Sequence, residues 1–172
     1  MMATPVQQNI VATSEQYSTG FTKGHLALPP AKKYLVVTCM DARIDPAAAW
    51  GIELGDAHVI RNAGGSAVDA LRSIIISQQL LGTREVVLVK HTGCGMLTFT
   101  NEDAHEVVRQ NLGDGAAAEL KQRNIDFLPF PHLENAVEED VQFLKETKLV
   151  PEDVAISGWV YEVETGQTKR VV

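Results

Sequence analysis

The sequence predicts an α/β fold: a mostly parallel, helix-flanked sheet of four to five strands with a C-terminal antiparallel addition. Two observations lead to this prediction. Short, β-branched apolar runs at 34–38 and 85–89 are typical of strands that are buried on both faces of a parallel sheet. Segments with helical periodicity lie between the runs, which is the order that parallel strands with crossover helices require.

The other elements follow in chain order. Residues 9–19 are expected to form a helix, and the Gly- and Pro-containing stretch that follows is expected to be extended. Apolar periodicity and turn residues predict helices at 47–50, 68–81, 101–112, 116–123 and 134–145, and further strands at 57–60 and 154–158. Residues 159–163 and 168–172, separated by a Glu-Thr-Gly-Gln turn, predict a terminal hairpin.

Length and composition indicate how the chain is organised. A chain of 172 residues fits one domain with a substantial core, and we assign this domain to residues 34–172. Residues 1–33 are polar and broken by glycine and proline, so they are not expected to fold alone. We expect them to form a helical and extended arm that packs on a partner subunit.

Charge and cysteine usage exclude several classes of function. The net charge of −7 argues against a nucleic-acid partner, since such proteins need a basic surface. No apolar run has the length of a membrane span, and the N-terminus lacks the pattern of a secretory signal. Two cysteines 55 positions apart are not a disulfide framework, so we expect a reducing, cytoplasmic location.

Two short motifs carry the chemistry. Cys39, Asp41 and Arg43 follow the first predicted strand, and His91 and Cys94 follow the run at 85–89. The carboxyl ends of parallel strands share one edge of the sheet, where open α/β sheets bind their ligands. Two cysteines and one histidine are three protein ligands, the number that catalytic zinc sites use. Cys39, His91 and Cys94 are therefore predicted to bind Zn²⁺, with Asp41 and Arg43 beside the open position.

Other interpretations of the same residues remain open. Cys39 and Cys94 can serve a zinc or thiol redox sensor, or can form a disulfide that acts as a switch. A hydrolase with Asp41, Lys90 and Cys94 as base, support and nucleophile is a further alternative. Strand alternation argues against it, because Lys90 and His91 are neighbours and should point to opposite sides of the sheet.

The motifs resemble those of the β-class carbonic anhydrases. Cys-x-Asp-x-Arg is followed some fifty residues later by His-x-x-Cys, and residues 55–64 and 159–166 are similar to two further motifs of that family. The similarity covers roughly residues 17–166. The residues within the two cysteine motifs resemble those of a short, compact subgroup of the family. This subgroup also contains carbonyl sulfide hydrolases.

The resemblance implies a β-carbonic anhydrase-like fold and a homodimer or homotetramer with embracing N-terminal arms. It implies a zinc-dependent lyase of the carbonate dehydratase type, with zinc on Cys39, His91 and Cys94 and a catalytic pair of Asp41 and Arg43. Zinc-bound hydroxide would then hydrate carbon dioxide to bicarbonate, while Asp41, held ionised by Arg43, orients that hydroxide.

Carbonyl sulfide hydrolysis by the same attack is the alternative activity, and two departures from the family pattern bear on the choice. Pro30 stands where many members place a glutamine that positions substrate, which favours the sulfur analogue. Val36 replaces a tryptophan found in bicarbonate-regulated members, which argues against that regulation.

Overall fold

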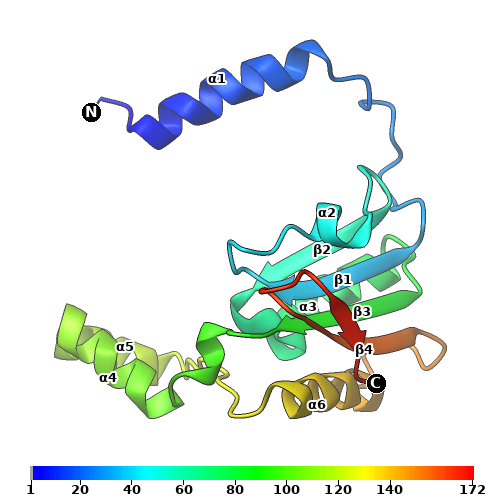
Figure 1. Ribbon diagram of the computed structural model, residues 1–172. Coiled ribbons are helices and arrows are strands. Elements are labelled where there is room, and N and C mark those ends of the chain that lie inside the picture. Colours follow the sequence, from blue (N-terminus) through cyan, green and yellow to red (C-terminus); the bar gives the residue numbers. More distant parts are fainter. Residues whose placement is uncertain (1) are drawn as a thin grey trace.

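The computed structural model describes residues 2–172 and confirms the predicted α/β fold (Figure 1). One sheet has the strand order β2-β1-β3-β4-β5. Its first four strands are parallel, and β5 pairs antiparallel with β4. The strands span Tyr34–Cys39 (β1), Ala57–Asn62 (β2), Glu85–His91 (β3), Ala155–Tyr161 (β4) and Thr168–Arg170 (β5).

Helices cover the sheet and extend beyond it. They span Pro5–Thr19 (α1), Pro46–Trp50 (α2), Ala67–Gln79 (α3), Asn101–Leu112 (α4), Asp114–Gln122 (α5) and Leu133–Glu146 (α6), with 3₁₀ turns at Ala63–Gly65 (η1) and Gly95–Leu97 (η2). The main core lies where α3 and α6 pack on the sheet, around Ile74, Leu88 and Val137. The helices α4 and α5 form a hairpin that projects away from the sheet (Figure 1).

The register of the central strands sets the position of the motifs. Tyr34 of β1 lies level with Glu85 of β3, and Thr38 lies level with Val89. Both strands are apolar and almost wholly buried, as expected for the middle of a parallel sheet. Cys39 and His91 therefore end neighbouring strands at the same edge.

Two predicted boundaries were wrong. Helix α1 begins at Pro5 rather than residue 9, because Thr4 and Gln7 form a reciprocal capping box. The predicted strand 154–158 and the first strand of the hairpin are one strand, β4, which bonds to β3 as far as Tyr161. Its last residues also pair with β5, so partners on both sides keep β4 extended through the predicted break.

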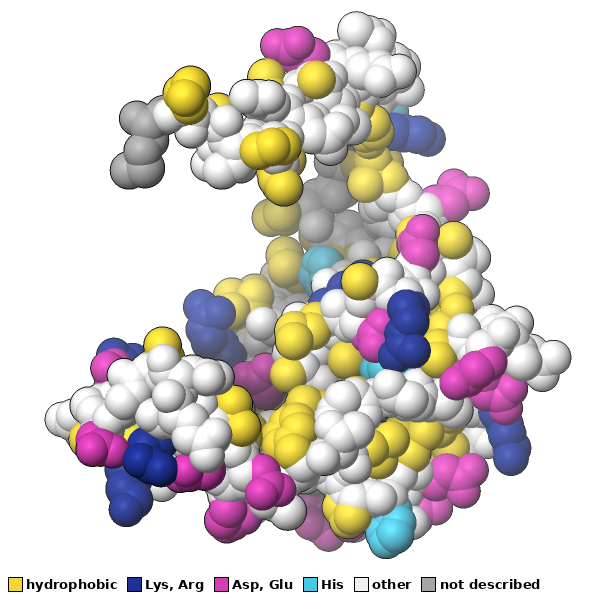
Figure 2. Space-filling view, turned by 60° about the vertical axis from the view of Figure 1, so that its left-hand side comes forward, with side chains coloured by type: hydrophobic (Ala, Val, Ile, Leu, Met, Phe, Trp, Pro, Cys, Tyr) yellow, Lys and Arg dark blue, Asp and Glu magenta, His cyan; other side chains and the backbone are white. Residues whose placement is uncertain are grey.

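The N-terminal arm lies apart from the sheet. Helix α1 has no buried residue, and Val6, Ile10 and Tyr17 are each at least 60% exposed. Figure 2 shows hydrophobic side chains along this helix. The chain joins the domain where Ala31 and Lys32 donate backbone hydrogen bonds to the carbonyls of Gly55 and Asp56. Within residues 2–172, no helix combines the length and the apolar character of a membrane span.

Candidate active site

Three potential metal ligands meet at the carboxyl edge of the sheet. Cys39 is the last residue of β1 and His91 the last of β3, while Cys94 follows in the turn after β3. Gly93 has a φ of +59°, which bends this turn back toward the sheet. The ligand atoms of Cys39, His91 and Cys94 lie within 4.8 Å of one another, and all three residues are buried. The structure thus brings together the three predicted ligands.

The hydrogen bonding of His91 fits a metal ligand. Its Nδ1 lies 2.8 Å from the carbonyl oxygen of Thr92, so this nitrogen carries the proton and donates it. The lone pair is then on Nε2, which is buried and has no hydrogen-bond partner within residues 2–172. A histidine ligand typically has its other ring nitrogen fixed by a carbonyl in this way.

The close approach of the two cysteine thiols also suits a bound cation. A hydrogen bond from Cys94 lowers the pKa of Cys39, and the same contact raises the pKa of Cys94. Two thiolates this close repel each other, so on their own they share one proton. A divalent cation removes this conflict, because it stabilises both thiolates at once. The donor set therefore suits Zn²⁺, which prefers sulfur and imidazole nitrogen.

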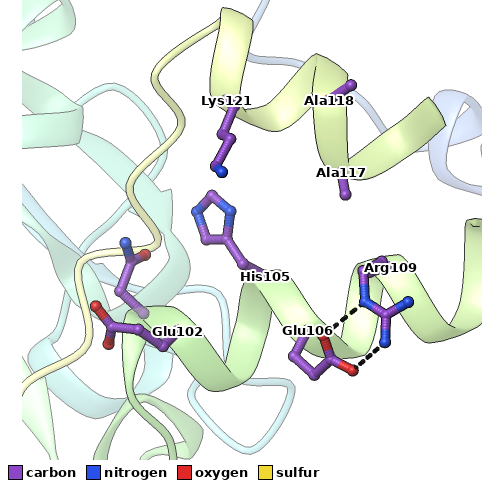
Figure 3. A pocket seen from close by; sticks show the side chains of 8 residues that line it. Glu102, His105, Glu106, Arg109, Ala117, Ala118 and Lys121 are labelled. Atoms are coloured by element: carbon purple, nitrogen blue, oxygen red, sulfur yellow. Dashed lines mark hydrogen bonds and ion pairs between the residues drawn. The ribbon is translucent and has the colours of Figure 1, made fainter. Parts of the chain in front are cut away.

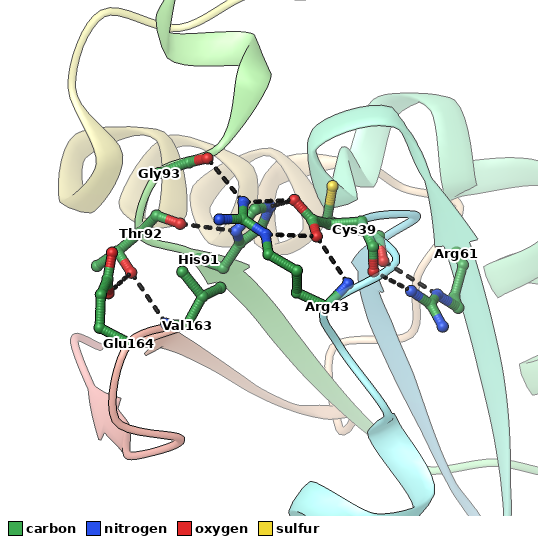
Figure 4. Close-up of polar contacts among 9 residues, drawn as sticks. Cys39, Arg43, Arg61, His91, Thr92, Gly93, Val163 and Glu164 are labelled. Carbon is green, nitrogen blue, oxygen red and sulfur yellow. Dashed lines mark hydrogen bonds and ion pairs between the residues drawn. The ribbon is translucent and has the colours of Figure 1, made fainter.

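Asp41 and Arg43 form a tightly bonded pair beside His91. Figure 4 shows the Arg43 side chain close to His91 and Gly93. Asp41 Oδ1 accepts from the backbone N and from Nε of Arg43, both at 2.9 Å, and Oδ2 accepts from Nη2 at 2.7 Å. These hydrogen bonds hold the pKa of Asp41 well below its usual range. Asp41 Oδ2 lies 3.8 Å from His91 Nε2, so the carboxylate faces the candidate metal position.

Arg43 and Arg61 each connect the first motif to another part of the site. Arg43 Nη2 also donates to the carbonyl of Gly93 at 3.0 Å, between His91 and Cys94. Arg61 Nε donates to the carbonyl of Cys39 at 3.0 Å, and its Nη2 donates to that of Asp41 at 2.6 Å. Arg61 therefore holds the backbone of the first motif in place.

Thr92 and Glu164 form a contact that sequence reasoning missed. Thr92 Oγ1 donates to Glu164 Oε2 at 2.7 Å and accepts from the backbone N of Val163 at 3.0 Å. This contact ties the turn that carries Cys94 to the end of β4 (Figure 4). The partners are 72 positions apart, and neither is itself a predicted ligand, so no local signal pointed to their contact.

The position of Lys90 argues against the alternative hydrolase. Its Nζ pairs with Asp140 Oδ2 at 2.8 Å, and its side chain is only 2% exposed. His91 instead faces Cys39 and Cys94 on the other side of β3, as strand alternation predicts. An ammonium already bonded to a carboxylate is poorly placed to support a nucleophile.

Two pockets differ in their relation to the site. A pocket of about 440 Å³ is lined partly by Leu97, Phe99 and Phe130, and Phe130 packs in the same buried cluster as Cys39 and Cys94. A pocket of about 620 Å³ between α4 and α5 shares no lining residue with the cluster (Figure 3). Arg109 in that pocket is already bonded to Glu106. The first pocket thus meets the buried cluster of the two cysteines at Phe130.

The fold and the site together define a class: a parallel α/β protein with a Cys₂His cluster and an Asp–Arg pair at its carboxyl edge. The family model described as carbonic anhydrase matches residues 34–168. The chain therefore belongs to the β-carbonic anhydrase family.

The individual relatives include proteins with two different names. β-Carbonic anhydrase 1 of Mycobacterium tuberculosis is 37% identical over 167 residues, which cover 96% of this chain and 98% of that protein. Carbon disulfide hydrolase of an Acidianus strain is 34% identical over 181 residues, covering 91% and 84%. The structure of carbonic anhydrase from Glaciozyma antarctica has a TM-score of 0.93 at 45% identity, covering 99% of this chain and all of that one.

Proposed function

We propose that this protein hydrates carbon dioxide to bicarbonate with Zn²⁺ bound by Cys39, His91 and Cys94. The observation that carries the proposal is the Asp41–Arg43 pair directed at a buried Cys₂His set. A purely structural metal site has no need for an oriented carboxylate at its open side. The family relationship and the relatives named carbonic anhydrase support the same reaction.

The bound metal would supply a Lewis acid that lets water act as a nucleophile near neutral pH. Asp41 would orient the attacking water. A carboxylate has about four lone-pair positions, and Arg43 occupies two on Oδ1 and one on Oδ2. The free position on Oδ2 can accept one hydrogen bond from the attacking water, which directs the opposite lone pair of that water at the substrate carbon.

Arg43 has two further effects on Asp41. Its positive charge keeps the carboxylate ionised, so Asp41 remains an acceptor rather than a donor. Its bidentate grip also fixes the carboxylate in place, which prevents Asp41 from turning to become a fourth ligand itself.

The surroundings of the site suit a small, uncharged substrate. Phe130 and Met96 pack in the same buried cluster as the two cysteines, and Val36 and Val89 extend its apolar wall. Carbon dioxide has an electrophilic carbon and little polarity, so it loses little on leaving water for apolar surroundings.

Hydrolysis of a sulfur analogue is the second candidate function. Carbonyl sulfide hydrolysis is the alternative activity given in the sequence analysis, and relatives about one third identical are named carbon disulfide hydrolase. Both compounds offer a similar electrophilic carbon. Pro30, in place of the usual positioning glutamine, is the feature of this chain that favours them.

A paired assay separates these functions. Purified, zinc-loaded protein is given carbon dioxide, carbonyl sulfide and carbon disulfide, and kcat/KM is compared, since discrimination is a ratio of these constants. We expect carbon dioxide to give the highest value. An advantage of more than about tenfold for a sulfur compound would establish the second candidate. Zinc binding without any turnover would favour the redox sensor.

We also propose that residues 1–33 are an arm that packs on a partner subunit, while residues 34–172 form the catalytic domain. The exposed apolar side chains of α1 support this proposal, because a helix with no buried residue has little to stabilise it in isolation. The assembly would be a homodimer or homotetramer. We place it in the cytoplasm, where thiolate ligands stay reduced.

A further inference from the structure

Lys90 is a buried lysine that the proposed mechanism does not use. It precedes His91 on β3 and points to the opposite side of the strand. Its Nζ donates to the carbonyl of Gly64 at 3.1 Å and to that of Gly65 at 3.4 Å, and it pairs with Asp140 at 2.8 Å. All three ammonium donors thus have acceptors.

The two carbonyls belong to the segment that lies against Cys39. Gly64 and Gly65 form most of η1, with φ values of +71° and +60°. A Cβ on Gly65 would lie 3.1 Å from the backbone N of Cys39, so the two backbones are in close contact. The position of η1 therefore constrains the backbone of Cys39.

Asp140 holds the other end of the same segment. Its Oδ2 accepts a hydrogen bond from the backbone N of Ala67, the first residue of α3, at 3.0 Å. Residues 64–67 are thus fixed between the ammonium of Lys90 and the carboxylate of Asp140. A buried ion pair adds little net stability, because removing two charges from water costs about as much as their attraction returns. Stability alone does not explain this pair.

We propose that Lys90 and Asp140 are positioning residues for the Cys39 ligand, holding η1 in close contact with the backbone of Cys39. The position of that backbone sets where the Cys39 sulfur lies relative to a bound metal. Groups that orient a ligand from behind commonly change metal affinity by about 10- to 100-fold. The inference rests on the proposed metal site.

The test compares two variants with a control on the same helix. Lys90→Met keeps the length of the side chain and removes its donors, while Asp140→Asn removes the charge and keeps an acceptor for Ala67. Val141→Ala is the control, because Val141 is buried on α6 and packs toward Gly158 rather than η1. Two quantities are measured: the zinc dissociation constant by chelator competition, and the thiolate-to-cobalt charge-transfer band of the Co²⁺-substituted protein.

We expect Lys90→Met to raise the zinc dissociation constant at least about tenfold and to shift the cobalt band. Asp140→Asn should change both in the same direction by less. Val141→Ala should lower Tm and leave both unchanged. If Lys90→Met does not fold, Asp140→Asn tests the proposal by the same zinc dissociation constant and cobalt band.

Three results would overturn the inference. The first is a folded variant with an unchanged band and a zinc dissociation constant within about twofold of the original chain. The second is an equal effect in Val141→Ala, which would indicate general destabilisation. The third is an original chain that binds neither Zn²⁺ nor Co²⁺, and only this result would also remove the proposed function.

Discussion

The arginine beside Asp41 determines what that carboxylate can do. A free aspartate titrates near pH 3.9 and rotates through several rotamers. In this site both oxygens are bonded to Arg43, and the side chain of Asp41 is only 17% exposed. The pair is therefore closer to a fixed, permanently charged acceptor than to a surface ion pair, which contributes little.

Replacing Asp41 by asparagine should separate catalysis from metal binding. We expect Asp41→Asn to retain zinc, because no predicted ligand is changed. The activity should fall by about a hundredfold or more, since the amide can donate a hydrogen bond where the carboxylate only accepts. Steady-state hydration rates are measured together with zinc content. Asp56→Asn, which alters a carboxylate paired with Lys32 at another position, is the control. Near-normal turnover in Asp41→Asn would show that the pair is structural.

The lowered pKa of Asp41 keeps that carboxyl group from contributing to the pH dependence of the reaction. A carboxylate with a depressed folded pKa contributes stability above its unfolded pKa of about 3.9 and loses it as pH falls through the lower folded value. Asp41 thus stays charged across the assay range. We expect kcat/KM to rise from about pH 6 to about pH 9 through one ionisation, that of the attacking water. A second ionisation in this range would contradict the assigned role of Asp41.

The residues that could be predicted are those whose chemistry is local in sequence. Cys39, Asp41 and Arg43 lie within five positions, and the structure places them as the motif implied. Thr92 and Glu164 could not be predicted, because their contact depends on where the end of β4 meets the turn after β3. The pairing of Lys90 with Asp140 could not be predicted either, because Asp140 is one of several acidic residues on an amphipathic helix.

At the scale of elements, the short turn η1 packs closely against the backbone of Cys39. Gly65 adopts a φ of +60°, and an added Cβ would meet the backbone of Thr38 and Cys39 at 3.1 Å. Gly82, after α3, has a similar φ of +75° with open space around it. The two glycines therefore share the conformational requirement and differ in steric contact.

Replacing each of these two glycines by alanine should separate the cost of a positive φ from the cost of steric contact. Both Gly65→Ala and Gly82→Ala place a side chain at positive φ, which costs about 1 kcal/mol or more. Gly65→Ala should be the more destabilising by about a further 1–3 kcal/mol, because backbone must move, and it alone should weaken zinc binding. Urea denaturation and chelator competition measure the two quantities. Equal costs at the two positions would contradict the close packing of η1 on Cys39.

The type and order of the elements could be predicted, but two of their ends could not. Continuous apolar runs identified the central strands β1 and β3, because these strands are buried on both faces. The C-terminal strand β5 is polar and mostly exposed, and it was predicted from the turn before it. The end of β4 depends on pairing with β3 and β5, which are distant in sequence. The start of α1 depends on a capping box formed by Thr4 and Gln7, which the prediction overlooked.

At the scale of the whole molecule, the N-terminal arm buries none of the apolar side chains of its helix in the part of the single chain that the structure describes. Its helix α1 and the following segment expose large apolar side chains, which a folded monomer seldom keeps in one place without a partner. The apolar positions on α1 and just beyond it are Val6, Ile10, Val11, Tyr17 and Phe21. A second copy of the chain is the partner that the family relationship favours.

Removing the arm should weaken the assembly. We expect the intact chain to sediment as a dimer or larger even assembly, and a chain lacking residues 1–24 to dissociate at micromolar concentration. The point variant Ile10→Asp should weaken it in the same direction. Leu149→Asp, which changes an exposed apolar residue on the domain itself, is the control. An unchanged oligomer after deletion would refute the arm hypothesis.

The metal content of the protein and its ligand variants tests the central claim most directly. Cys39→Ser, His91→Ala and Cys94→Ser each remove one donor from a buried set whose three ligand atoms lie within 4.8 Å of one another. A site with three protein ligands should not hold zinc tightly with two. We predict about one zinc per chain in the original protein and loss of zinc in each variant. Full zinc retention in any of the three variants would contradict the ligand set.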